Sequence, residues 1–379
     1  MAFGRFLRFS RAHFYCATAL LCSRPSFGVV QFKSEVKPFT YKISNFTGTL
    51  QLTVKDDVES IKMPLEIMRQ RLAQSVNDET VEPITVMLGA AETQISAMAE
   101  KLAIKGKEDD LAAYIRRQIS QAQKVEALPT ARTIIINREA FNYIDHEALA
   151  ELYSKPQHNL TVDGAALKSD RGMRKELFQE VAPFLAVTAR RNLQRKINKG
   201  EPLNVNSDLL PEFARNMVKK FIIYRGPNCF HAALAFQSPL LTSSSQINVK
   251  REVGYHRAMI NYDELWRELN QDFYEIEPEK HQLKFGDMLV LFDVPTSYAR
   301  QPEGPPDFHW IRHTATYLFE GYTFSKGSKS PNTPYGVRTL EEEWNTWKHF
   351  SKNLGVKVYR RSLKAINPHP PADQSDWIY

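Results

Sequence analysis

One cysteine of this chain stands where it could act as a nucleophile. Cys229 follows a turn-forming Gly-Pro-Asn at 226–228 and precedes an apolar, alanine-rich segment at 230–236 that we expect to be helical. A thiol in the first turn of a helix faces unpaired backbone N–H groups and the positive end of the helix dipole, and both stabilise the thiolate. Because a thiolate attacks carbonyl carbons, this position suits covalent catalysis. The alternative is a small buried apolar residue, a common environment for free cysteine.

A catalytic thiol also needs a base, and His313 is the preferred candidate. It lies in a segment, 311–319, whose alternation predicts a strand. An imidazole there could hold Cys229 as an ion pair and protonate the leaving amine. His309 is the rival, but His313 keeps the strand phase of Ile311, Ala315 and Tyr317. His231 would point elsewhere on the helix that follows the cysteine.

Three motifs in this order resemble those of the NlpC-like cell-wall cysteine peptidases, a superfamily related to papain. They are Gly-Pro-Asn-Cys at 226–229, Phe-Gly-Asp followed by an apolar strand at 285–292, and the segment from histidine to glycine at 313–321. The resemblance covers about residues 205–365 and matches the unpermuted members, in which the cysteine precedes the histidine. It implies an α+β, papain-like catalytic domain in which an antiparallel sheet packs on helices.

The resemblance also suggests the remaining site residues. Counting along the family's hairpin places Ser325 at the position that orients the imidazole, usually His, Asn or Gln. Serine orients weakly, so a backbone carbonyl could serve instead. Tyr224 stands where related sites often carry a tyrosine, and it would assist the Cys229 N–H in holding the oxyanion; the alternative is a core aromatic. Asp287 is expected to cap a turn.

Several positions depart from the family pattern. Asn228 replaces the usual aspartate, and Phe-His at 230–231 replaces the expected Ser-Gly. The cysteine and histidine are also further apart than is typical. We attribute this to insertions at 238–282 and 295–308, which could shape a substrate cleft.

The N-terminus predicts export. Arginines precede an apolar segment at 14–22, and small residues at 26–28 offer a cleavage site, so residues 1–28 fit a secretory signal and a periplasmic or secreted protein. The absence of acidic residues before Glu35 makes an organellar transit peptide the competing interpretation. A lipoprotein modified at Cys22 is disfavoured by the large residue before it. No apolar run is long enough to predict a transmembrane segment.

The charge balance argues against a nucleic-acid partner. Cleavage after residue 28 would remove four arginines and no acid, lowering the formal net charge from +7 to +3. The isoelectric point near 9.1 is therefore partly a property of the signal. Cleavage would also leave Cys229 as the one thiol. Since no His/Cys/Asp cluster has the spacing of metal ligands, we predict no metal and no cofactor.

Helical periodicity dominates the first half of the chain. Apolar residues recur every three or four positions at 61–72, 84–102 and 111–119, which predicts three helices starting near residue 58. They could form a self-contained bundle or meet a protein partner. Residues 139–154 and the basic segment 171–198 also predict helices, and we expect Pro183 to kink the second.

Other segments predict strands, turns or linkers. We expect a hairpin at 39–55, a linker at 155–170, helices at 209–221 and 261–271, and strands at 288–292 and 311–319; the segment 133–136 is too short to classify. The predicted organisation is a signal (1–28), strands or a linker (29–57), a mainly helical domain (58–200) and the peptidase-like domain (201–379).

The leading interpretation is an exported cysteine hydrolase that cleaves amide bonds in peptidoglycan stem peptides through an acyl-enzyme. The helical region would position the catalytic domain on the wall or on a partner. Two alternatives stay open: a non-catalytic binding or scaffold protein on a papain-like fold, and a cysteine amidase or acyltransferase with a non-wall substrate.

Overall fold

The computed structural model describes residues 52–75, 77, 81, 83–87, 91–126, 133–246, 248–251, 254–276, 281–293, 311–351 and 354–362. The predicted signal, most of the predicted hairpin at 39–55 and the predicted insertion at 295–308 lie outside these residues. Helices and antiparallel sheets mix along the chain, so the α+β class is as predicted.

A six-stranded sheet forms the centre of the main body, with the order β12-β11-β10-β9-β13-β8 and antiparallel pairing throughout. Its strands are β8 (Phe273–Ile276), β9 (Met288–Asp293), β10 (Ile311–Tyr317), β11 (Tyr322–Lys326), β12 (Tyr335–Thr339) and β13 (Leu354–Arg361). Alternate residues of β9 belong to different core clusters. Met288 and Val290 pack with Cys229, whereas Leu289 and Leu291 pack with Trp344. Helices therefore cover both faces of the sheet.

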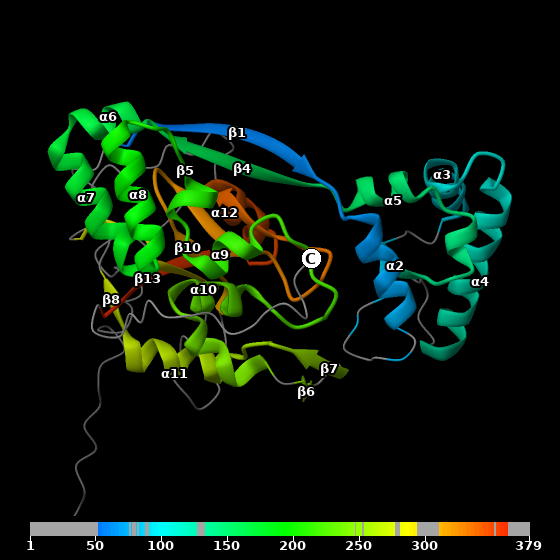
Figure 1. The fold of residues 1–379 in the computed structure, drawn as a ribbon. Coiled ribbons are helices and arrows are strands. Elements are labelled where there is room, and N and C mark those ends of the chain that lie inside the picture. Colours follow the sequence, from blue (N-terminus) through cyan, green and yellow to red (C-terminus); the bar gives the residue numbers. More distant parts are fainter. Residues whose placement is uncertain are drawn as a thin grey trace, which may run out of the picture.

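The helices of the main body enclose this sheet (Figure 1). On one face lie α9 (Glu212–Met217), α10 (Cys229–Gln237) and α11 (Tyr262–Asp272), and the other face is covered by α12 (Leu340–Lys348). A cluster of three helices at one end consists of α6 (Gly164–Ser169), α7 (Arg171–Val181) and α8 (Val187–Lys199). The hairpin β6 (Asn248–Arg251) and β7 (Gly254–Arg257) lies beside α11. Short turns of other helix types are η1 (Ala140–Asn142), η2 (Ala182–Phe184), η3 (Val205–Leu209) and η4 (Pro239–Gln246).

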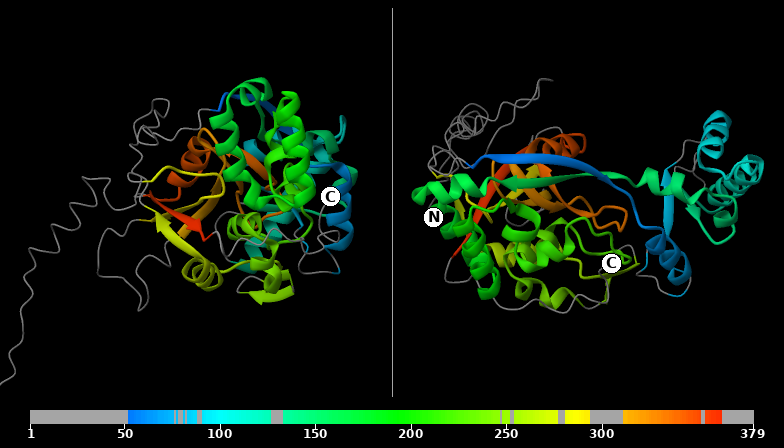
Figure 2. Two further views of the ribbon diagram at one scale, coloured as in Figure 1. Left: turned by 60° about the vertical axis from the view of Figure 1, so that its left-hand side comes forward. Right: turned by 45° about the horizontal axis from the view of Figure 1, so that its top comes forward.

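A long two-stranded arm crosses the main body. It pairs β1 (Val54–Ile61) with β4 (Lys155–Val162) over their whole lengths, and β5 (Leu203–Asn204) adds to β4. Beyond the arm lies a separate group of helices, which we call the distal lobe, residues 62–153 (Figures 1 and 2). It contains α2 (Leu65–Gln74), β2 (Ile84–Met87), α3 (Glu92–Leu102), α4 (Glu108–Glu126), β3 (Thr133–Ile136) and α5 (His146–Leu152).

The distal lobe has its own core but is tied to the main body. Its apolar cluster runs from Met63 to Tyr153 and also includes Phe221. The buried Arg71 donates to the carbonyl of Pro83 within the lobe (2.9 Å) and to the side chain of Asn332 in the main body (2.5 Å). These contacts hold one end of the lobe against the loop between β11 and β12.

The predicted domain boundary near residue 200 is wrong. A single apolar cluster joins Leu160 and Ile197 to Phe236 and Phe324, so residues on both sides of 200 share one core. The predicted linker at 155–170 is β4 followed by α6, with Leu160 and Leu167 fully buried. Its polar residues include the caps of α6 and α7, Asp163 and Asp170, which explains why the segment looked like a loop.

Two predicted helices begin later than expected. The segment from residue 58 continues as β1, and helix starts only at Leu65. Residues 84–87 form β2, paired with the segment 133–136, before α3 begins at Glu92. In both places a distant strand supplies backbone partners, which local periodicity does not reveal. Residues 139–154 are helical only in part, and the predicted helix at 209–221 is confined to α9.

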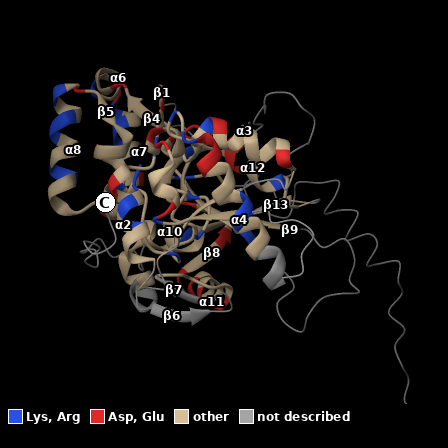
Figure 3. Ribbon diagram, turned by 90° about the vertical axis from the view of Figure 1, so that its right-hand side faces the viewer, with Lys and Arg blue, Asp and Glu red and all other residues tan. Residues whose placement is uncertain are grey.

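Pro183 ends a helix rather than bending one. It lies in η2 between α7 and α8, so the predicted long helix is two helices. The second, α8, is basic along its length, as Figure 3 shows, and carries Lys196 and Lys199 in its last turn. Lys196 pairs with Asp208 at 2.7 Å and Lys199 with Glu201 at 3.2 Å. Part of the predicted basic cluster is thus neutralised within the chain.

Candidate active site

Cys229 is the first residue of α10, and Asn228 caps the helix. The Asn228 side-chain oxygen accepts a hydrogen bond from the His231 N–H at 3.1 Å, and its amide donates to the Ile260 carbonyl at 2.7 Å. An aspartate could form the first bond but has no donor for the second. Because one side chain both accepts and donates here, asparagine fits this position better than the aspartate usual in the NlpC-like pattern. The cysteine itself is only 6% exposed.

His313 approaches the thiol from β10, at a register shift in that strand. Its neighbours pair regularly with β9, but the register shifts between Ile311 and His313. Such a bulge re-aims a side chain, and bulges are common beside active sites. The predicted simple alternation of His313 with Ile311 is therefore wrong at this point. The imidazole is fully buried and lies near enough to Cys229 for its charge to lower the pKa of the thiol.

Glu343 of α12 holds the other side of the imidazole. Its Oε2 lies 2.9 Å from His313 Nε2, and both side chains are buried. The two atoms are close but poorly aligned for a hydrogen bond, so charge attraction dominates the contact. The ring of Trp347 stacks on His313 with centroids 4.8 Å apart and an interplanar angle of 19°. Carboxylate and indole together fix the orientation of the imidazole.

Ser325 does not contact the imidazole in the predicted way. From β11 its hydroxyl donates to Glu343 Oε1 through a short, buried hydrogen bond. The prediction that Ser325 orients His313 is corrected, because Glu343 occupies that place and Ser325 supports it. A carboxylate both reaches further and carries a charge to balance an imidazolium, which a serine hydroxyl lacks.

The three groups stabilise one another as ions. Burial opposes ionisation of Cys229, but the charge of His313, its contact with the sulfur and the backbone N–H groups of Thr314 and Phe230 lower the pKa of the thiol. Burial likewise opposes a charged His313, yet Glu343 and Cys229 raise its pKa. Against burial, His313 and then Arg338 and Ser325 lower the pKa of Glu343. These directions favour a thiolate–imidazolium pair with the Glu343 carboxylate as its counter-charge.

Tyr224 packs against the main core, and its backbone forms an isolated β-bridge with Val81 of the distal lobe. Its predicted part in holding the oxyanion stays a prediction. Asp287 caps its turn as predicted, accepting from the Lys284 N–H at 2.7 Å. It also forms a two-pronged ion pair with Arg360, with contacts of 2.8 and 2.7 Å.

Of the two other histidines considered for the site, the structure describes His231. His231 is buried and meets the ring of Phe213 edge-on, with centroids 5.7 Å apart. Burial lowers the pKa of His231 to about 3, so it is neutral. His309 lies outside the described residues.

The sequence carries one signal for Glu343 that periodicity could have revealed. The acidic run 341–343 suggests a solvated helix face. Position 343, however, falls on the apolar stripe that Leu340, Trp344 and Trp347 define in α12. A carboxylate on a core-facing stripe is a candidate for a buried charge with a partner.

Within the described part of the chain, no group of three or more His, Cys, Asp or Glu side chains is placed to hold a metal ion. In that same part, the helices are either too short or too polar to cross a membrane. No family model matches this chain, and neither the curated proteins nor the solved structures contain a match to it.

Proposed function

We propose that this chain is an exported cysteine hydrolase that cleaves amide bonds in peptidoglycan stem peptides, on a papain-like domain of the NlpC type. The observation that supports catalysis is the buried row of Cys229, His313 and Glu343. The wall substrate and the export rest on the three sequence motifs and on the signal predicted at 1–28.

The proposed reaction follows from the charges in this row. The Cys229 thiolate attacks the amide carbonyl carbon, forming a C–S bond and an oxyanion that the cysteine N–H helps to hold. His313 gives its proton to the amine nitrogen as the C–N bond breaks. Water then attacks the thioester while the imidazole removes its proton, which frees the acid and restores the thiolate. Glu343 stabilises the imidazolium throughout without giving up or taking a proton.

The same chemistry serves the second candidate, a cysteine amidase or acyltransferase with a non-wall substrate. A non-catalytic binding or scaffold protein would not require an ionised thiol. The small exposure of Cys229, 6%, is the observation that favours this alternative, because a substrate must reach the sulfur.

The decisive experiment compares wild type, Cys229→Ala and His313→Ala on purified sacculi, with mass analysis of the products. We expect new peptide ends from the wild type only. Thiol alkylation by iodoacetamide near pH 6 runs in parallel, where an ordinary thiol of pKa about 8.5 is almost wholly protonated. Fast alkylation that depends on His313, without products from sacculi, would support a cysteine enzyme but reject peptidoglycan as its substrate. Slow alkylation at a rate that His313→Ala does not change would reject catalysis, provided that a small methanethiosulfonate probe gives the same result.

A further inference from the structure

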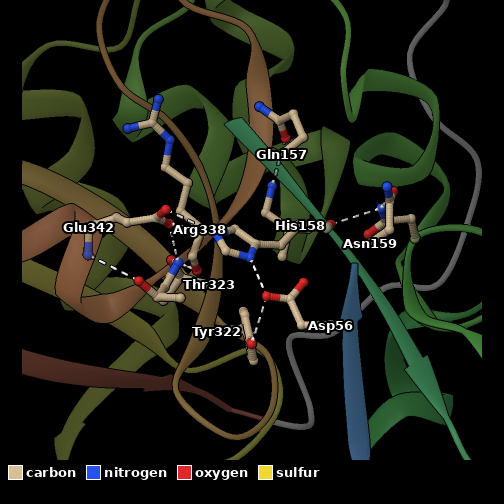
Figure 4. A network of polar contacts seen from close by, with 11 residues as sticks. Asp56, Gln157, His158, Asn159, Tyr322, Thr323, Arg338 and Glu342 are labelled. Carbon is tan, nitrogen blue, oxygen red and sulfur yellow. Dashed lines mark hydrogen bonds and ion pairs between the residues drawn. The ribbon is translucent and has the colours of Figure 1, made fainter. Parts of the chain in front are cut away.

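A polar network joins the β1–β4 arm to the helix that carries Glu343 (Figure 4). At its centre, His158 of β4 lies between two carboxylates. Its Nδ1 is 2.6 Å from Asp56 Oδ2 on β1, and its Nε2 is 2.9 and 3.0 Å from the two carboxylate oxygens of Glu342 on α12. The hydroxyl of Tyr322 on β11 donates to Asp56 at 3.1 Å.

Glu342 connects this network to the first turn of α12. Its carboxylate accepts from the Thr339 N–H at 2.8 Å, and the Thr339 hydroxyl accepts from the Glu342 N–H at 3.1 Å, a reciprocal cap. The next residue in the helix is Glu343, which pairs with His313. His158 therefore anchors the helical turn from which the catalytic imidazole is oriented.

A second contact sets the arm against the strand that leads into α12. The buried side chain of Gln157, on β4, accepts from the Val337 N–H at 3.2 Å. Gly336 leaves the space for it, because a Cβ atom there would overlap the Gln157 amide. Gly336 also pairs with Ser325, the residue that donates to Glu343. The arm thus contacts both the strand and the helix that support Glu343.

We infer that His158 is a positioning residue for the active site: bridging Asp56 and Glu342, it fixes α12 so that Glu343 meets His313. The inference rests on the proposed function, since it assigns regulation of the same thiol–imidazole pair. It also gives the β1–β4 arm a task in catalysis through its contacts with β11, β12 and α12.

The charges around His158 suit a doubly protonated ring. Only imidazolium donates from both nitrogens, and both face carboxylate oxygens. Asp56, Glu342 and the Tyr322 hydroxyl face it from three elements, and Arg338 of β12 is the further charge near Glu342. The contact with Glu342, and after it that with Asp56, raises the pKa of His158 against the effect of burial. At pH values above the lowered pKa of Glu342 and below the raised pKa of His158, both groups are charged and the bridge is intact.

The test is the pH profile of Cys229 alkylation in the full chain, with His158→Gln as the variant. Glutamine can donate to one carboxylate but cannot carry the charge that holds both. His146 provides the matched control: it is a partly buried histidine of the distal lobe that contacts the Phe141 carbonyl, and His146→Gln leaves α12 untouched.

We expect wild type and His146→Gln to share one thiolate midpoint. In His158→Gln the midpoint should rise by about half to one pH unit, which lowers the alkylation rate near pH 6 about 3- to 10-fold. Glu342→Gln should shift the midpoint similarly, and the double variant should shift it no further than either single change, because the two groups act through one contact. Loss of thermal stability with an unaltered midpoint would show a structural role only and overturn the inference.

Tyr322→Phe is the milder variant if His158→Gln does not fold, because it removes one hydroxyl from Asp56 and should shift the midpoint in the same direction by less. An unchanged midpoint in this variant and in Glu342→Gln would also overturn the inference. A wild type that alkylates slowly near pH 6 would reject the proposed function instead. The two failures are therefore distinguishable.

Discussion

Two neighbouring glutamates of α12 serve two histidines in different surroundings. Glu343 and His313 are 1% and 0% exposed, whereas Glu342 and His158 are 36% and 7% exposed. The separations are the same, 2.9 Å from Nε2 to the carboxylate oxygen in each pair. The difference between the pairs is thus in burial and not in the distance between the charges.

Burial decides what each pair can do. Inside the main body, little solvent screens the Glu343–His313 pair, so each charge depends on the other and a change at one alters the pKa of the other. That coupling extends to Cys229 and suits a reaction that moves a proton. At the arm, water reaches Glu342 and weakens the attraction, so that pair suits the positioning of one element on another. Substitutions at the buried pair should therefore have larger effects than substitutions at the arm.

Glu343→Gln should have the largest effect. Removing one partner of a buried ion pair typically costs about 3–5 kcal/mol, since the remaining charge is left without compensation. His313 would then give up its proton, and the rate of Cys229 alkylation near pH 6 should fall at least about 10-fold. Urea denaturation and alkylation kinetics measure the two effects. An unchanged alkylation rate in a folded variant would refute the coupling.

Ser325→Ala should come second. It leaves a buried oxygen of Glu343 without its donor, at a cost of about 1–3 kcal/mol. Thr346→Ala is a matched control on the same helix, because the Thr346 hydroxyl donates to the Glu342 carbonyl at 2.8 Å but is exposed. Its cost should stay within about 0.5 kcal/mol. Equal losses in the two variants would contradict the importance of burial here.

Glu342→Gln should cost less than either change at the buried pair, about 0.5–1 kcal/mol, because solvent already screens the contact. This loss should shrink in 1 M salt, where the screening length is about 3 Å. The cost of Glu343→Gln should persist in the same salt. A salt response of the same size in both variants would show that the two pairs do not differ in screening.

The pH dependence of His158→Gln should be the smallest effect, below about 1 kcal/mol after solvent screening. The folded-state pKa of His158 is raised, so its contribution is fully present below the ordinary histidine value and is lost as pH rises through the raised value. At low pH the contribution falls again as Glu342, with its lowered pKa, becomes protonated. Urea unfolding of wild type and variant at pH 5, 7 and 9 measures this, and a stability difference that grows toward pH 9 would contradict the sign.

Segments whose structure depends on near neighbours could be predicted. The amphipathic spacing of α4 and α11, the apolar run of β9 and the turn between β10 and β11 all agree with expectation. The arm could not be predicted, because β1 and β4 are about a hundred residues apart in the chain. Each segment by itself has the pattern of a helix or a linker. A polar, half-exposed strand carries little local signal, and its partner determines its structure.

Local signals in the chain are enough to predict that Cys229 begins a helix and that His313 lies on a strand, because turn residues, an apolar helix and an alternating pattern are local. Long-range packing, in contrast, places Glu343 rather than Ser325 against the imidazole. It also decided which of two adjacent glutamates is buried. A carboxylate's burial depends on its partners in space, here His313 and Ser325 for Glu343 and His158 of the arm for Glu342. All three partners lie outside α12 in the chain.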